Sequence, residues 1–435
     1  MKHPAAALLM AACLEASVVG AQGAAFARHF ELRQEAGVRT SDAHAQTLRS
    51  MLSADLEYRP HARVSLRLLA RGWYDWRYAF DDDLRAASGN QGRDRAELRD
   101  AALRVGWGKT DITLGRQLVT WGRADGVRVL DLINPLDLRE FIIEDHADSK
   151  VPLWMAEAKR YFGDWSAQLV VAPEHGRTRF AAPGTDFYDA YHDTALGESL
   201  PRRGAGRFGW DDPDVALQVA GRVGRVDVSL NGYRGYEHTF AVGFDVSLGP
   251  NGPSVQPLRV YRRVHAVGAG WAAPVGTWVL RGESLLALDR AFSVARPALG
   301  RALGADPSGQ GLVERRNVVA LVGADRTWNA AFLSAQVYVD HAGGGALPLE
   351  RRPTTTLGTL LFWRDWRNGT WRGQVLSIYD FDDQTLLAEP RILYQVSDAL
   401  AVSLGADIFI ARDERSFTGQ FQRANRLVAT LRLQN

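Results

Sequence analysis

The sequence predicts an all-β protein: a closed antiparallel transmembrane β-barrel of about 16–18 strands, with short periplasmic turns and long extracellular loops. Three observations predict this fold. Apolar and polar residues alternate along most of the chain, which indicates strands. After residue 27 there is no apolar run of about 18 residues, and short turns alternate with long polar loops. Since a bilayer is crossed either by helices or by a closed barrel, the alternating strands indicate a barrel.

The chain divides into a leader and one barrel domain. A short basic start, Met1-Lys2-His3, precedes a mostly apolar segment and then small residues, with Ala21-Gln22-Gly23 or Ala25-Phe26-Ala27 as the cleavage box. This pattern is typical of a secretory signal peptide, predicted over residues 1–27. Residues 28–435 are predicted to form the barrel in the outer membrane of a Gram-negative cell. The expected partners there are outer-membrane lipid and the barrel-assembly machinery.

Composition excludes several classes of protein. The 435 residues hold 52 Lys+Arg and 50 Asp+Glu, so the net charge of +2 gives no general field for binding nucleic acid. A hydrophobic content of 46% excludes a disordered chain. The single cysteine, Cys13, excludes an internal disulfide framework and any Cys-based metal site.

The clearest alternation covers residues 64–80, which are predicted to form one strand. Its even positions are mostly apolar and end in aromatic residues, whereas its odd positions include three arginines and an aspartate. Lipid favours the first face and a wet lumen the second. Further alternating segments are 226–231, 331–340, 400–410 and 426–434. We expect Val402, Leu404 and Leu431 to face lipid, and Asp407 and Arg71 to face the lumen.

The connections predict the strand count. Short turns are expected near residues 60–62, 108–110, 163–164, 224–225, 274–276, 326–327, 368–369 and 397–398. Long loops are expected near residues 39–47, 81–95, 123–152, 174–213, 236–257, 290–311, 341–353, 381–388 and 411–420. These connections join eighteen strands, and an even count leaves both termini on the periplasmic side. Trp363, Trp366 and Trp371 around one turn are interpreted as an interface belt. The alternative, a secreted propeller or solenoid, lacks a repeated blade motif.

The 123–152 loop carries the main functional prediction. It is too long for an ordinary connection and combines seven acids with eight large apolar residues. We interpret it as folded against the inner wall, where it narrows the channel; the alternative is a structural lid over the mouth. The predicted constriction combines loop residues with wall arginines: Asp137, Arg139, Glu140, Glu144, Asp145, Arg71, Arg104 and Arg116. Opposed charges there would set an electric field across the channel. An equal alternative is that the lumen arginines only form ion pairs with acids of the wall and set no such field.

Part of this region resembles a known family. Gly115-Arg116-Gln117, Trp121-Gly122, Asn134-Pro135-Leu136-Asp137 and Val151-Pro152 are similar to an uncharacterised proteobacterial family of outer-membrane barrels, filed as a domain of unknown function. The close resemblance covers residues 115–173. It implies an outer-membrane, porin-like protein and supplies no substrate and no catalytic residues.

Two functions follow from these patterns. The first is a porin-like channel that passes small solutes, with the 123–152 loop as a luminal constriction. The alternative is a plugged, non-transport barrel whose long loops bind a partner or a surface polymer. No catalytic signature and no cofactor site is predicted. A metal site in the 174–213 loop is not predicted either, because its His and Asp residues are better interpreted as solvated than as ion ligands. These residues are His175, Asp186, Asp189, His192 and Asp193. The sequence leaves a homo-oligomer open.

Overall fold

The computed structural model describes residues 25–435 except 89–91, 142–147, 189–199, 205, 250–251 and 307–308. Its main feature is an antiparallel sheet of 18 strands in which sequence neighbours pair throughout. The first and last strands also pair, from Glu31 with Gln434 to Arg39 with Arg426, so the sheet closes into a barrel. The predicted fold class is therefore confirmed, and the count lies at the upper end of the predicted range.

The barrel strands are β1 (Ala25–Arg39), β2 (Ala45–His61), β3 (Val64–Asp75), β4 (Asp94–Trp107), β5 (Thr110–Gln117), β7 (Leu153–Phe162), β8 (Trp165–Ala172), β11 (Asp214–Val223), β12 (Val226–Tyr236), β15 (Arg263–Val275), β16 (Trp278–Ser293), β17 (Leu312–Trp328), β18 (Ala331–Ala342), β19 (Thr354–Trp366), β20 (Trp371–Asp380), β21 (Thr385–Gln395), β22 (Leu400–Ile410) and β23 (Arg426–Gln434). The predicted short turns join two of these strands at one end of the barrel, except that residues 326–327 still belong to β17 and the turn to β18 is at 329–330. The predicted long loops lie at the other end.

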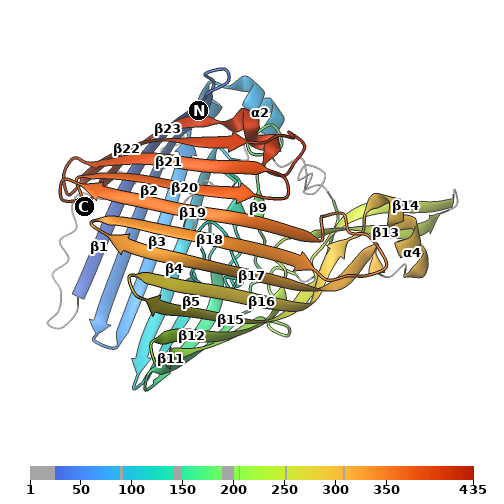
Figure 1. Cartoon of the computed structure of the whole chain (residues 1–435), viewed down its shortest axis with the longest axis horizontal. Helices are drawn as coiled ribbons and strands as arrows, with labels where there is room; N and C mark the ends of the chain where they lie inside the picture. The colour runs from blue at the N-terminus through green and yellow to red at the C-terminus, as the bar shows by residue number, and fades with distance from the viewer. Residues whose placement is uncertain are drawn as a thin grey trace.

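Short elements occupy the loops. They are β6 (Asp137–Leu138), β9 (Arg179–Phe180), β10 (Arg202–Arg203), β13 (Ala241–Gly249), β14 (Gly252–Val260), α2 (Asp82–Ser88), α4 (Leu299–Ala305), and the 3-10 turns η1 (Trp76–Ala79), η2 (Arg296–Ala298) and η4 (Gly419–Ala424). The loop expected at 236–257 contains the β13–β14 hairpin, which projects with α4 beyond the loop end of the barrel (Figure 1). No helix in the described part of the chain is long and apolar enough to cross a membrane.

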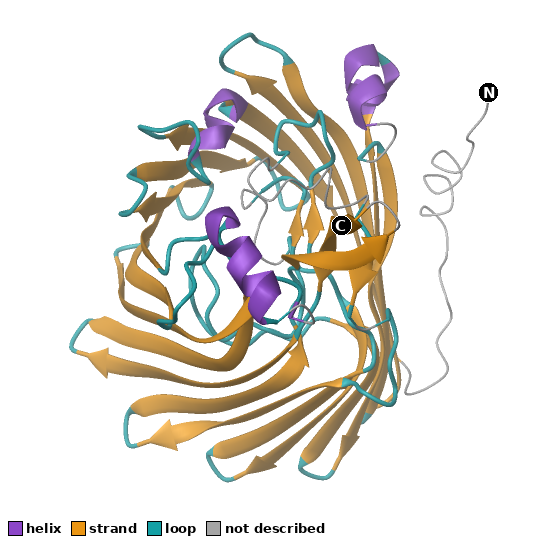
Figure 2. Ribbon diagram, turned by 90° about the vertical axis from the view of Figure 1, so that its right-hand side faces the viewer, coloured by secondary structure: helices purple, strands orange, loops and turns teal. Residues whose placement is uncertain are grey.

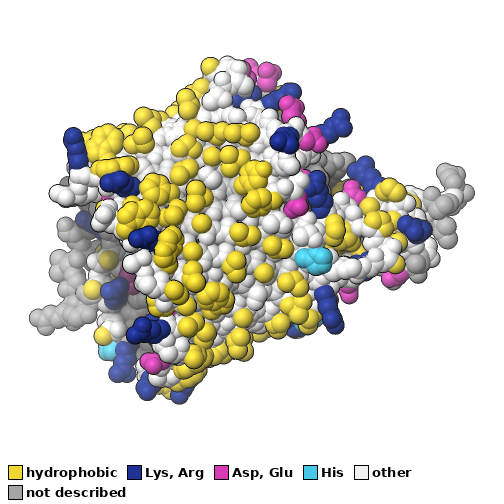
Figure 3. All heavy atoms as spheres, viewed as in Figure 1, with side chains coloured by type: hydrophobic (Ala, Val, Ile, Leu, Met, Phe, Trp, Pro, Cys, Tyr) yellow, Lys and Arg dark blue, Asp and Glu magenta, His cyan; other side chains and the backbone are white. Residues whose placement is uncertain are grey.

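Side chains alternate between the outside and the lumen as predicted. Leu404 is 62% exposed on the outer surface, whereas Asp407, three positions along, is completely buried on the inner side. Leu431 is also exposed, and Arg71 is buried. The outer surface of the strands carries apolar side chains, and charged ones gather toward its two ends (Figure 3). This is the surface that a hydrocarbon layer requires.

Exposed aromatic residues mark both ends of the barrel. At the short-turn end they include Tyr58, Trp107, Phe162, Trp328, Trp366, Trp371 and Tyr394; at the loop end they include Trp76, Phe80, Trp154, Tyr379 and Phe381. Aromatic girdles of this kind lie at the two membrane interfaces. Trp363 was wrongly assigned to the belt, because it pairs with Phe332 on the lumen face and stacks on that ring.

The strand predicted over residues 64–80 is too long. β3 ends at Asp75, whose carboxylate accepts a hydrogen bond from the Arg77 main-chain N–H at 3.1 Å. That local contact stabilises the 3-10 turn η1 and competes with continued pairing. Residues 1–24 lie outside the described residues, so the signal peptide stays a prediction.

Candidate functional site

The long connection between β5 and β7, residues 118–152, is called the inner loop here, and its described residues, 118–141 and 148–152, enter the barrel. Figure 2 shows loop segments inside the ring of strands. Val129, Leu130 and Ile133 of the inner loop are buried against side chains of the inner wall. These wall residues are Leu153, Met155, Val170, Ala172, Ala216, Tyr233, Val264, Ala266, Leu285, Ala287, Val319 and Leu321. The loop is therefore packed against the wall, as its apolar content predicted. Ile142 and Ile143 lie outside the described residues.

A second apolar contact fixes the far side of the inner loop. Phe141 packs against Phe187, Phe409 and Phe421, and its ring centroid lies 4.5 Å from that of Phe421. Because the two apolar clusters lie on different strands, the inner loop spans the lumen between them rather than following one side of the wall.

The short sequence motifs of this region have physical roles. Asn134 is completely buried; its Oδ1 accepts a hydrogen bond from the Val119 N–H at 2.8 Å, and its Nδ2 donates to the Val151 carbonyl at 3.0 Å. One side chain thus ties the start of the inner loop to its end. Gly122 has φ +84°, a backbone conformation that glycine adopts readily and L side chains rarely do.

The acids of the inner loop form ion pairs with arginines. Asp137 contacts Arg139 at 2.7 Å, Arg95 at 3.1 Å and Arg179 at 3.2 Å. Asp148 contacts Arg71 at 2.8 Å. The prediction placed acids of this loop opposite wall arginines. Asp148 with Arg71, and Asp137 with Arg95, are arranged in that way.

Glu140 is an acid of the inner loop with a strongly shifted pKa. Its carboxylate lies 2.6 Å from Arg49 and 3.2 Å from Arg426. Burial alone would raise the pKa of Glu140, but Arg49, Arg426 and Arg77 outweigh burial and lower the pKa to about 2. Glu140 is therefore ionised at every physiological pH and holds the loop to β2 and β23.

Trp73 is a lumen residue that the sequence analysis did not single out. The guanidinium groups of Arg49, Arg71, Arg95 and Arg139 all lie within 5.8 Å of its ring centroid. Cations are attracted to the face of an indole ring. The signal was present in the sequence, because Trp73 is the one aromatic residue on the arginine-bearing face of the 64–80 alternation.

The structure brings together only part of the predicted constriction. Arg71, Asp137, Arg139 and Glu140 surround or adjoin Trp73. Arg116 is not among the groups around Trp73; it pairs with Glu174 at 3.1 Å and lines the same hollow as Arg139. Arg104 pairs with Asp100 of its own strand at 2.6 Å, and Glu144 and Asp145 lie outside the described residues.

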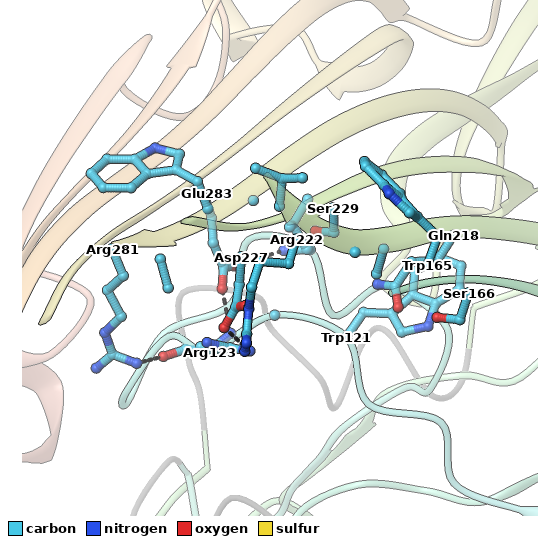
Figure 4. Close-up of a pocket in the computed structure, with 18 of the residues that line it drawn as sticks. Trp121, Arg123, Trp165, Ser166, Gln218, Arg222, Asp227, Ser229, Arg281 and Glu283 are labelled. Carbon is cyan, nitrogen blue, oxygen red and sulfur yellow. Dashed lines mark hydrogen bonds and ion pairs between the residues drawn. The ribbon is translucent and has the colours of Figure 1, made fainter. Parts of the chain in front are cut away.

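Two hollows adjoin the inner loop from opposite ends of the barrel. The turn-side hollow has a volume of about 650 Å³ and is lined by Trp121 and Arg123 of the inner loop, by Arg281 and Glu283 of β16, and by residues near the turns, including Asp227. Figure 4 shows Arg123 directed toward Asp227, with Trp121 and Trp165 on the other side. The arginine hollow, about 610 Å³, lies at the loop end and includes Arg139. Among the described residues the two linings do not overlap, and the inner loop contributes to both: Trp121 and Arg123 to the turn-side hollow, and Arg139 and Val151 to the arginine hollow.

The side chain of His238 connects three loops, one of which is the inner loop. Its Nδ1 lies 2.9 Å from the Gly176 carbonyl oxygen, and its Nε2 lies 2.9 Å from the Leu132 carbonyl oxygen. Gly176 belongs to the loop at 173–213 and Leu132 to the inner loop. The imidazole therefore helps to fix the relative position of the two loops that line the arginine hollow.

No metal centre is evident in the described part of the chain, where no group of three His, Cys, Asp or Glu side chains is placed to hold an ion. His175 contacts Asp214 at 3.2 Å, and Asp186 contacts Arg39 and Arg77. The other residues that were considered as ion ligands are Asp189, His192 and Asp193, and they lie outside the described residues.

A closed even-stranded barrel with an apolar outer face, aromatic girdles and a charged lumen defines a porin-like transmembrane barrel of the outer-membrane type. The chain belongs to the family described as "Protein of unknown function (DUF1302)", whose model matches residues 38–370. The match extends well beyond the residues 115–173 that carry the motif resemblance. No curated protein matches the sequence.

Solved structures share the fold at low sequence identity. OccK2 (OpdF) of Pseudomonas aeruginosa, solved in complex with glucuronate, is 12% identical with a TM-score of 0.53, covering 95% of this chain and 99% of its own. OccAB3 of Acinetobacter baumannii is 10% identical with a TM-score of 0.53, covering 94% and 99%. OccK5 (OpdH) of Pseudomonas aeruginosa is 9% identical with a TM-score of 0.51, covering 94% and 97%. At these identities the likeness shows the fold alone.

Proposed function

We propose that the chain is a porin-like channel of the outer membrane that passes small polar solutes, with the inner loop as its luminal constriction. The observation that carries the proposal is the position of this loop, which is anchored to the wall and contributes to the lining of two polar hollows. A barrel of this strand number leaves space for a lumen that holds water and small solutes. The structure of OccK2 with glucuronate supports a small solute, although by fold similarity only.

The charges support a path for polar rather than apolar solutes. The turn-side hollow contains Arg123, Asp227, Arg281 and Glu283, and the arginine hollow contains eight arginines. Such side chains attract and orient charged or hydrogen-bonding solutes. The proposal assigns the chain no catalytic activity and no cofactor. Outer-membrane lipid, the barrel-assembly machinery and a homo-oligomer stay predicted partners.

Single-channel recording in planar bilayers tests the proposal. The channel hypothesis predicts discrete conductance steps for the assembled protein and larger steps after deletion of residues 131–145, which include Asn134 and Glu140. Deletion of residues 246–255, in the hairpin that projects from the barrel, serves as the matched control and should leave the step size unchanged.

The plugged barrel is the second candidate, and a specific observation favours it: in the described part of the chain, no residue lines both hollows. In that case the assembled protein would give no steps, whereas the 131–145 deletion would open it. A silent deletion variant that is correctly assembled would contradict both the channel and the plug held by the inner loop.

A further inference from the structure

The arginine hollow has an unusual concentration of positive charge. Among the described residues that line it are eight arginines (Arg95, Arg116, Arg139, Arg177, Arg179, Arg202, Arg207 and Arg259) and only two acids, Asp94 and Glu174. Two further carboxylates, Glu97 and Asp137, do not line the hollow but form ion pairs with Arg95, which does. Among the described residues, eight guanidinium groups and four carboxylates therefore lie at this space, whose volume of about 610 Å³ is typical of a small-ligand site.

The base of the hollow is rigid. Arg95 and Arg179 share Glu97 and Asp137, at distances of 2.9 to 3.2 Å. Arg116 is buried; it donates to the Leu98 carbonyl at 2.7 Å and pairs with Glu174 at 3.1 Å. A guanidinium group has five N–H donors, so an arginine held by one carboxylate keeps donors for a ligand. Held arginines present these donors with little loss of conformational freedom on binding.

The rim of the hollow carries the arginines that are more accessible. Arg202 and Arg207 are exposed, and the guanidinium of Arg177 lies 4.7 Å from the centre of the Tyr261 ring. Arg202 is placed beside Arg259 by the parallel pairing of β10 with β14. Burial lowers the pKa of Arg177, and the like charges of Arg202 and Arg207 lower it further. A bound anion would relieve this repulsion.

We propose that the arginine hollow is a binding site for small organic oxyanions, such as dicarboxylates, on the loop side of the inner loop. Guanidinium groups bind carboxylates through paired, charge-assisted hydrogen bonds, and several of them around one space favour a ligand with more than one negative charge. The site deepens the proposed channel function and rests on it for its biological role. Binding itself is measurable without any conduction.

Calorimetry on the full barrel in detergent tests the site, with succinate as the probe. Succinamide, which has the same skeleton without the charges, is the control ligand. The rim variant R202Q/R207Q changes two exposed residues and is expected to fold. Its matched control is R63Q/R225Q, which removes two exposed arginines near short turns at the other end of the barrel.

The site predicts saturable succinate binding that weakens at least about tenfold in R202Q/R207Q, as the loss of charge-assisted hydrogen bonds requires. Binding should also weaken when the ionic strength rises from about 0.05 M to about 0.5 M, and R63Q/R225Q should bind like the parent. Equal binding of succinamide, an equal loss in R63Q/R225Q, or no saturable binding by the parent would each overturn the site. Binding without conductance would contradict only the channel function, and conductance without binding only the site.

Discussion

Replacing Glu140 with Gln tests how the inner loop is held. The Glu140 carboxylate pairs with Arg49 at 2.6 Å and Arg426 at 3.2 Å, and both arginine side chains are less than 10% exposed. A carboxyl whose pKa falls from 4.5 to about 2 on folding contributes about 3 kcal/mol at neutral pH. Removing one partner of a buried ionic cluster costs about 3–5 kcal/mol. Since Arg426 keeps Asp407 as a partner, we expect E140Q to lower the free energy of unfolding by about 3 kcal/mol.

The assay is denaturant unfolding of the barrel in lipid vesicles, followed by tryptophan fluorescence. E57Q is the matched control, because Glu57 pairs with Arg59, whose side chain is 60% exposed, and an exposed pair contributes less than about 1 kcal/mol. If E140Q is no more destabilising than E57Q, the ion pairs do not anchor the loop and the reasoning fails.

Three further predictions concern acidity, selectivity and register. The stabilisation from Glu140 is complete above a pH of about 4.5 and is lost as the pH falls toward about 2. The difference in unfolding free energy between the parent and E140Q should therefore shrink over this range. A constant difference would contradict the ionised state of Glu140. D137N/E140Q/E144Q should shift the reversal potential in a salt gradient toward anions, because wall arginines lose their partners, whereas D42N/D398N/E414Q at the strand ends should not. L404R, on the lipid face, should cost about 2–4 kcal/mol in folding titrations if Leu404 lies near mid-bilayer, and S403R much less; equal costs would show that the facing is wrong.

The strands and turns were predictable because their signals are local. Alternation of side chains sets both the strand and its face, as at Leu404 and Asp407, and short turns separate the hairpins. The end of β3 was missed because one hydrogen bond, from the Arg77 N–H to Asp75, decides it. The face of Trp363 was missed because its stacking partner, Phe332, is supplied by the neighbouring strand.

The site was predictable only in part. The apolar residues of the inner loop indicated burial, and Leu130 and Ile133 are indeed packed on the wall. The arginine hollow could not be found from the sequence, because it forms where the 173–213 loop, which carries Arg177, meets β4, β14 and the inner loop. The motif resemblance marked Arg116 but not its partner Glu174, which lies 58 positions away.

The conductance of single assembled barrels tests the central claim most directly. The account predicts discrete steps for the parent protein in planar bilayers, larger steps after deletion of residues 131–145, and parental steps after deletion of residues 246–255. If the assembled parent and the assembled 131–145 deletion gave steps of the same size, the inner loop would not be the constriction, and its contribution to the two hollows would have no role in transport.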